Sequence, residues 1–194
     1  MKELLNMLKI LLSLLALAGL LALSGTLWLG YELYASGFSA RVEPHPLEVT
    51  VVRQFRRFAI PKAVGNMPNP VPKSPAVLVE GLDHFADHCA GCHANDGSGE
   101  TQIGKDVYPR VPDLRRQEIQ SMSDGELFFI IRNGIRFTAM PAWAEGDMEK
   151  DRGSWKLVHF IRHLPHLTHE ELERMQSLNP KGPHHDEGAE HHHH

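Results

Sequence analysis

The sequence predicts an all-α protein, with about three to four helices forming one domain behind an N-terminal transmembrane helix and an extended tether. Three observations predict this class. A long uncharged apolar run lies near the N-terminus, a proline-rich stretch follows it, and the remainder carries helix-start signals without a convincing strand pattern. With 194 residues, the chain leaves room for one domain of ordinary size after the apolar run.

The apolar run begins after Lys2 and Lys9 and extends from Ile10 to Leu29 without a charged residue. A helix over this run spans roughly 30 Å, the thickness of one hydrocarbon core. Aromatic residues that favour the membrane interface gather at its far end, at Trp28, Tyr31 and Tyr34. We therefore expect residues 1–9 in the cytoplasm, a single-pass anchor over 10–30, and everything after it in the periplasm.

A cleaved signal peptide is the alternative interpretation of the same run. Ala22 and Ser24 occupy small positions before a cut at Gly25. The apolar residues continue through Leu29, past that point, which favours the uncleaved anchor. Either form exports the rest of the chain.

Residues 31–74 are expected to form a basic, proline-rich tether. Prolines block continuous helix and strand at positions 44, 46, 61, 68, 70 and 72. One short amphipathic helix ending before Pro61 is predicted, because Leu47, Val51, Phe55 and Phe58 recur at helical spacing.

Charge differs between the tether and the domain that follows. Residues 41–74 hold six Lys or Arg against two acids, net +4, and residues 75–150 hold seven against thirteen, net −6. This asymmetry favours either docking of the tether on the domain or steering of a partner, or it reflects merely solvated faces.

Three helices are predicted in the domain. The first begins at the Ser74 cap with Pro75 in its first turn and runs through Leu82 and Phe85. The second opens with the capping box Ser123–Glu126 and stops at Asn133-Gly134. The third covers roughly 154–163, and Pro165 ends it.

Both cysteines of the chain lie in the run Cys89-Ala90-Gly91-Cys92-His93. C-x-x-C-H is the attachment signature of a c-type haem, because two thiols one helical turn apart reach both vinyl groups while the histidine turns onto the iron. A dithiol redox motif would need a βαβ setting, and a zinc site would need a fourth ligand. Two buried structural cysteines would leave His93 unexplained.

The candidate for the second axial ligand is Met140, in the loop Thr138–Trp143, where Pro141 restrains the backbone. A methionine alone is more often a core residue. Met67, Met122 and Met148 are competitors, less well placed for a loop that returns over the haem.

Over roughly residues 75–166, the sequence resembles the class I cytochrome c family. Cys89, Cys92 and His93 are similar to its haem motif, and Met140-Pro141 resembles its distal methionine loop. The resemblance implies the class I cytochrome c fold around one covalently bound haem c, with His93 and Met140 as axial ligands of the iron.

Finer marks carry the same resemblance. Gly81 and Phe85 stand at the family's spacing before Cys89, and the matching residues on the closing helix are Leu157 and Phe160. Pro112-Asp113-Leu114 resembles the family's Pro-x-Leu, which implies that the carbonyl of Pro112 accepts a hydrogen bond from the His93 ring. The haem propionates have several candidate partners, none singled out: Tyr108, Arg110, Arg115, Arg116 and Trp143.

These features predict a membrane-tethered monohaem c-type cytochrome that carries single electrons between periplasm-facing respiratory partners at the inner membrane. The expected partners are membrane lipid, through the N-terminal helix, and redox proteins; no nucleic acid is expected. No catalytic acid/base pair, nucleophile motif or phosphate-binding glycine loop indicates a separate enzymatic activity.

Three alternatives stay open. In the first, the chain is a haem subunit of a larger oxidoreductase. In the second, it is a haem sensor or peroxidase-like protein, if Met140 is not a stable ligand. The third is metal handling by a polar, His-rich tail over 167–194, through His184, His185 and residues 191–194; the four terminal histidines also look like the remnant of a purification tag. Four earlier histidines, at positions 159, 163, 166 and 169, are expected on the surface.

Overall fold

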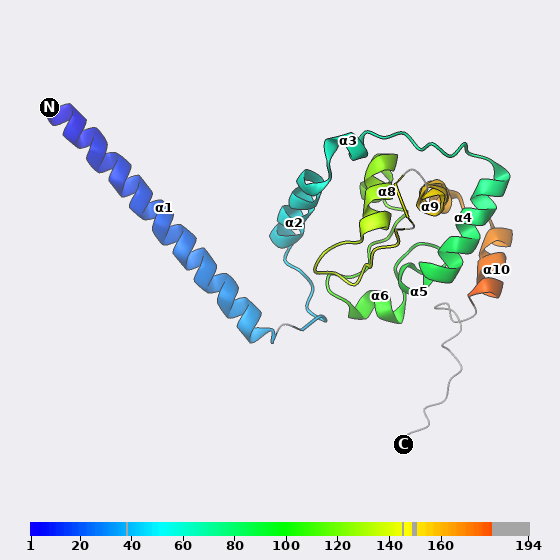
Figure 1. Ribbon diagram of the computed structural model, residues 1–194. Coiled ribbons are helices and arrows are strands. Elements are labelled where there is room, and N and C mark those ends of the chain that lie inside the picture. Colours follow the sequence, from blue (N-terminus) through cyan, green and yellow to red (C-terminus); the bar gives the residue numbers. More distant parts are fainter. Residues whose placement is uncertain (38, 145, 149–150, 180–194) are drawn as a thin grey trace, which may run out of the picture. The chain divides into compact units, whose positions relative to one another are not determined.

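The computed structural model describes residues 1–37, 39–144, 146–148 and 151–179 (Figure 1). These residues form helices and no strand, which confirms the predicted all-α class. The chain divides after Val42 into two units, each described by itself below.

The first unit consists of helix α1, Lys2–Ala35, and a short continuation to Val42. None of its described residues is buried, and α1 is the one helix in the described part of the chain that is long and apolar enough to cross a membrane. Hydroxyl groups within it bond back to the helix backbone, Ser13 to the Lys9 carbonyl at 2.9 Å and Thr26 to the Ala22 carbonyl at 2.9 Å. These hydroxyl groups within the apolar run are therefore satisfied without water.

The second unit begins with α2, Pro46–Ala59, and α3, Lys62–Gly65. The ring of His45 caps α2 by accepting a hydrogen bond from the Leu47 amide at 3.2 Å, and Pro46 occupies the first turn. The helix ends at Ala59, before Pro61, which confirms the predicted amphipathic helix.

Helices α4, Pro75–His88, and α9, Arg152–His163, form the central pair of the domain (Figure 1). The hydroxyl of Ser74 caps α4 as expected. A Cβ atom at Gly81 would lie 2.7 Å from the Lys156 carbonyl oxygen and 3.0 Å from Cβ of Phe160. The two backbones therefore cross too closely for any side chain at position 81.

Helix α8, Asp124–Asn133, packs on α9 from another side. Its start carries both hydrogen bonds of the capping box between Ser123 and Glu126, and it ends at Gly134 with φ of 65°. The rings of Phe128 and Trp155 stack with centroids 4.0 Å apart, and both side chains are almost completely buried. This stacked pair joins α8 to α9.

The structure differs from the expected tether over 31–74 at both ends. Residues 31–35 continue α1. The stretch 60–74 is built into the domain, because α3 packs on α8 and Val71 is only 1% exposed. Asn69 holds it in place: its side chain donates to the Trp155 carbonyl at 2.9 Å and accepts from the Val71 amide at 2.9 Å. Prolines prevent regular structure here, but they do not prevent burial of the apolar residues between them.

The expected polar tail over 167–194 also needs correction, because it begins with a further helix, α10, His169–Leu178, packed on α4. A capping box between Thr168 and Glu171 starts this helix, Met175 is fully buried, and Arg174 forms an ion pair with Asp83 at 2.8 Å. Only a few apolar residues in a charged segment support the helix, so its sequence reads as polar.

Two of the histidines expected on the surface have structural contacts. The Nε2 atom of His159 lies 2.6 Å from the Val71 carbonyl oxygen, and that of His163 lies 2.8 Å from the Glu171 carboxylate. The ring of His159 therefore joins α9 to the proline-rich stretch before α4, and the ring of His163 joins α9 to α10.

The remaining elements are short: α5, Ala90–His93; α6, Gln102–Asp106; α7, Gln117–Gln120; and the 3₁₀ turn Leu164–His166. They surround one apolar core, to which α4, α8, α9 and α10 each contribute buried side chains.

The crossing at Gly81 generates a test of the fold. Replacing glycine by alanine in an exposed helix normally stabilises it by about 1 kcal/mol. Gly81→Ala should instead lower the free energy of unfolding by roughly 1–3 kcal/mol, because the added methyl forces α4 and α9 apart. Thermal and denaturant unfolding of the haem-loaded protein measure the change. The matched control is Gly65→Ala, whose Cβ would lie 3.7 Å from its nearest neighbours and should cost little.

Candidate haem-attachment site

The C-x-x-C-H run occupies one helical turn at the end of α4. Cys89 lies between the two helices, as the C-cap of α4 and the N-cap of α5, and the amide of His93 donates to its carbonyl at 2.9 Å. Both thiols are free and half-buried. The structure thus places the two thiols and the imidazole on a single turn, as their spacing predicts.

The His93 ring lies against the apolar core. Phe85 contacts it with ring centroids 6.4 Å apart, and contacts Phe160 on the other helix at 5.2 Å. Burial lowers the pKa of His93 to about 4, so the ring is neutral and able to donate a lone pair to a metal. Burial, with a smaller contribution from Cys92, raises the pKa of the Cys89 thiol to about 12. An uncharged ring and thiol suit the apolar surface of a porphyrin.

The surroundings of the Nδ1 atom of His93 bear on the role predicted for Pro112. The Nδ1 atom is buried and, among the described residues, makes no hydrogen bond of normal geometry. A backbone interaction of the His93 ring with Pro112 acts to raise the pKa of His93, against the larger effect of burial. The structure therefore brings Pro112 next to a histidine whose buried Nδ1 atom has no other partner among the described residues.

Hydrogen bonds and ion pairs join residues 96–104, which follow the C-x-x-C-H motif, to residues 111–115, which include Pro112. The amide of Leu114 donates to the Gly97 carbonyl at 2.8 Å, and that of Val111 donates to the Gly104 carbonyl at 3.0 Å. The guanidinium of Arg115 bridges Asp96, at 2.8 Å, and Asp113, at 2.9 Å. That contact with Arg115 holds the pKa of Asp113 below its usual range.

Thr101 is a site residue that sequence analysis missed. Its hydroxyl donates to the Cys92 carbonyl at 3.0 Å and accepts from the Gly104 amide at 2.8 Å, and the residue is 6% exposed. One side chain therefore fixes the backbone of the second cysteine and also caps α6. The sequence signal for this role is a helix cap: Thr101 stands three residues before Gly104, at the start of α6.

Met140 lies on the loop that connects α8 with α9. Its carbonyl accepts from the Ile135 amide at 3.1 Å, and its amide donates to the Thr138 hydroxyl at 3.2 Å. Gly134 allows the loop to close, since a Cβ there would lie 2.6 Å from the Pro141 carbonyl carbon. The loop is held by its own backbone, with Met140 half-buried.

The ends of this loop are fixed to the domain. The carboxylate of Asp151 is fully buried, caps α9 through the Ser154 amide at 3.1 Å, and pairs with Arg132 of α8 at 2.8 Å. Trp143, three residues after Met140, contacts the His88 ring with centroids 5.4 Å apart. The Met140 loop is thereby brought to the end of α4, next to the C-x-x-C-H turn.

The competing methionines lie in other surroundings. Met122 is a buried core residue, Met67 packs partly buried against the core, and Met148 is exposed. Met148 shares the α8–α9 connection with Met140 and Trp143, but it lies five residues beyond Trp143 and its side chain is exposed.

Comparison with protein families gives a match over this part of the chain. The family model described as cytochrome c oxidase, cbb3-type, subunit III matches residues 76–161, from the first turn of α4 to α9. The chain carries a class I c-type cytochrome domain. It is an electron-transfer haem protein, and the resemblance inferred from the C-x-x-C-H run and its flanking residues is confirmed at the level of the domain.

Most propionate candidates have protein partners in the cytochrome domain. Tyr108 donates to Glu48, and Arg110 pairs with Glu43 at 3.2 Å. Arg115 binds two aspartates, and Arg116 lies 3.7 Å from Asp113. The hydrogen bond of Tyr108 and the ion pairs of the three arginines connect separate segments of the chain or brace a turn. The geometry singles out no propionate ligand.

Metal sites other than the haem site were sought in the described part of the chain. No group of three His, Cys, Asp or Glu residues there is arranged to hold a metal ion. The histidines considered for metal handling, at positions 184, 185 and 191–194, lie outside the described residues.

The Asp113–Arg115 contact generates a pH-dependent prediction. Because the pKa of Asp113 is lowered in the folded protein, its ionised form stabilises the fold above the unfolded pKa of about 4, and this stability is lost as the pH falls through the lower folded value. Asp113→Asn should lower the free energy of unfolding by about 1 kcal/mol at pH 7, and the difference should vanish at low pH. Denaturant titrations from pH 7 to pH 2 measure this. The exposed Glu170→Gln variant is the control; a constant difference across the range would contradict the assigned role.

Proposed function

We propose that the protein is a membrane-tethered monohaem c-type cytochrome that transfers single electrons between redox partners facing the periplasm at the inner membrane. The observation that carries the proposal is the C-x-x-C-H turn with its half-buried, neutral His93 ring, next to the methionine loop that Trp143 joins to the end of α4. The chain has two cysteines, both in that turn, which supports one covalent attachment.

Each site residue has a role in this proposal. Cys89 and Cys92 would hold the haem through thioether links, and His93 and Met140 would be the protein ligands of its iron. Haem held in this way would supply reversible one-electron chemistry. With both ligands supplied by side chains, the protein would stabilise both oxidation states with little rearrangement, as electron transfer requires.

Pro112 orients the proximal histidine. Its carbonyl would accept the Nδ1 hydrogen of His93 in the haem-loaded protein, which would fix the tautomer and leave Nε2 for the metal. The hydrogen bonds and ion pairs of Leu114 and Arg115 hold this carbonyl in position. The buried Nδ1 atom, otherwise without a partner of normal geometry in the described structure, supports the assignment.

Helix α1 is the proposed anchor. Its length and apolar surface suit a bilayer, and Lys2 and Lys9 before the apolar run favour a cytoplasmic N-terminus. The domain then lies on the periplasmic side, where covalent haem attachment takes place in bacteria.

A second candidate is a haem subunit of a larger oxidoreductase. The description of the matching family, a subunit of a cbb3-type cytochrome c oxidase, favours it. Purification in mild detergent separates the two, since a subunit copurifies with its complex in fixed proportion and an independent carrier does not.

The test of the proposed ligand set uses Met140→Ala. The protein is made with the haem-attachment machinery, and its spectra are recorded oxidised and dithionite-reduced. The original protein should be low-spin, with a weak near-infrared sulfur-to-iron band and little carbon monoxide binding. Met140→Ala should lose that band and bind carbon monoxide rapidly, because one axial position is opened.

Met148→Ala is the matched control, since Met148 is an exposed methionine on the same α8–α9 connection. It should leave the spectrum unchanged. A high-spin iron that binds carbon monoxide in the original protein would replace the electron carrier by the sensor or peroxidase-like reading, and a protein without covalent haem would contradict both.

A further inference from the structure

Helix α2 carries an exposed apolar stripe. Leu47, Val51, Phe55 and Phe58 lie four, four and three residues apart, so all four point from the same face of the helix. The two phenylalanines are 71% and 85% exposed, and Leu47 is 65% exposed. Large aromatic side chains so fully open to solvent need a partner surface.

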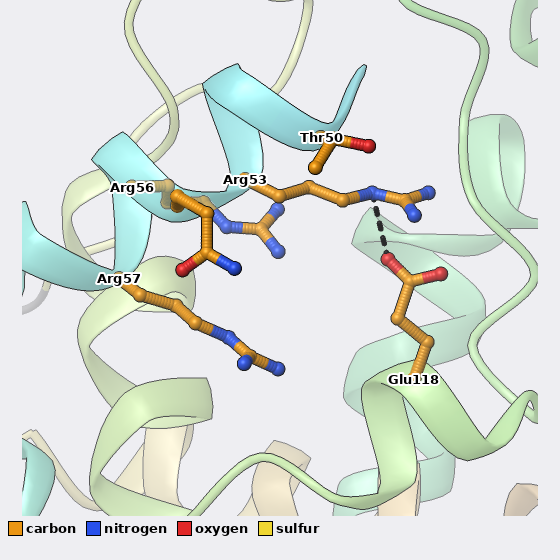
Figure 2. Close-up of a pocket in the computed structure, with 6 residues that line it drawn as sticks. Thr50, Arg53, Arg56, Arg57 and Glu118 are labelled. Carbon is orange, nitrogen blue, oxygen red and sulfur yellow. Dashed lines mark ion pairs between the residues drawn. The ribbon is translucent and has the colours of Figure 1, made fainter. Parts of the chain in front are cut away.

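The opposite face of α2 is turned to the cytochrome domain, and it is the polar one. Val49 and Arg56 on this face are half-buried, and Ile60, directly after the helix, is buried. Figure 2 shows Arg53, Arg56 and Arg57 leaving the helix, with Arg53 reaching Glu118 of α7 at 2.8 Å. An amphipathic helix on a soluble domain normally buries its apolar face; α2 does the reverse, so its apolar face is reserved for something outside the domain.

The N-terminal side of α2 is tied down as well. Glu43 pairs with Arg110 at 3.2 Å, and Glu48 accepts a hydrogen bond from Tyr108. The contacts at both ends hold the helix in an orientation that presents the stripe outward. The stripe is therefore a fixed feature of the domain surface.

The position of α2 in the chain identifies the surface that covers the stripe. Only residues 36–45 separate α2 from the end of α1, a distance of at most roughly 35 Å when fully extended. The segment 41–74 carries a net charge of +4. An exposed stripe of aromatic and aliphatic side chains within a basic segment, a few residues after a membrane anchor, matches a bilayer interface with anionic headgroups.

We propose that α2 is an interfacial helix, which lies in the outer headgroup region of the bilayer with Leu47, Val51, Phe55 and Phe58 inserted toward the acyl chains. The inference rests on the membrane anchor proposed above. It adds a second contact with the same membrane, so that the cytochrome domain sits on the bilayer surface in one orientation and does not move freely on its arm.

The experiment measures the depth of spin labels in the haem-loaded full chain, reduced and reconstituted in bilayers of phosphatidylethanolamine and phosphatidylglycerol. Labels are attached to Phe55→Cys and Phe58→Cys and compared with Ile103→Cys, an exposed apolar position on α6. Collision with oxygen, which concentrates in the bilayer, is compared with collision with a water-soluble nickel chelate. A fourth variant, Ser13→Cys, places a label within the apolar run of α1.

The expected result is a higher oxygen-to-nickel accessibility ratio, by at least threefold, at positions 55 and 58 than at position 103. Labels at 55 and 58 that collide with nickel as freely as the label at 103 would overturn the inference. Labels shielded from both reagents would overturn it too, because a second copy or another protein would then cover the stripe.

The label at position 13 separates this inference from the anchor on which it rests. A bilayer-accessible label at 13 with water-exposed labels at 55 and 58 refutes the interfacial helix and leaves the anchor standing. Loss of residue 13 from the mature protein refutes the anchor itself. A further label, at Val51→Cys, tests the contribution of the two phenylalanines. This label should be shielded from nickel by the bilayer in the otherwise unchanged protein. It should become accessible to nickel when Phe55 and Phe58 are both replaced by Ser, and it should stay shielded when Ile103 is replaced by Ser.

Discussion

The close crossing of α4 and α9 at Gly81 is the constraint on which the rest of the cytochrome domain depends. With no side chain at this position, the backbone of α4 reaches the Lys156 carbonyl of α9. One turn later, Phe85 meets Phe160 and the ring of His93. Because α4 runs directly into the C-x-x-C-H turn, the crossing determines where both thiols and the imidazole lie.

The site itself is built from irregular backbone held by a few polar side chains. Thr101 fixes the carbonyl of Cys92, and Arg115 joins the two segments that bring Pro112 to the histidine. The ion pair of Arg132 with the fully buried Asp151 closes the base of the methionine loop. Buried polar groups satisfied in this way impose one geometry on loops that have no regular structure of their own.

Local signals account for what the sequence could predict. The caps at Ser74 and Ser123, the stop at Gly134 and the five-residue haem motif each depend on residues a few positions apart. The contacts that escaped prediction join distant residues: Asn69 to Trp155, His159 to Val71, and Arg174 to Asp83. Neither partner segment contains a local pattern that indicates such a pair. The sequence therefore predicts a polar tail where α10 lies and a tether where the proline-rich stretch packs on the domain. The roles of His93, Met140 and Pro112 remain predictions from the motif and its surroundings.

If the proposed anchor holds the chain in a bilayer, the incorporation of residues 46–74 into the domain would change how widely the haem domain can search for partners. A free tether over 31–74 would reach roughly 150 Å from the bilayer, whereas residues 36–45 would reach roughly 35 Å. The largest volume available to the domain would fall with the cube of that radius, by about eightyfold, and the local concentration of the domain would rise in proportion. Electron exchange would thereby be confined to partners whose redox centres lie close to the same membrane, and diffusing carriers would have to approach that surface to be reached.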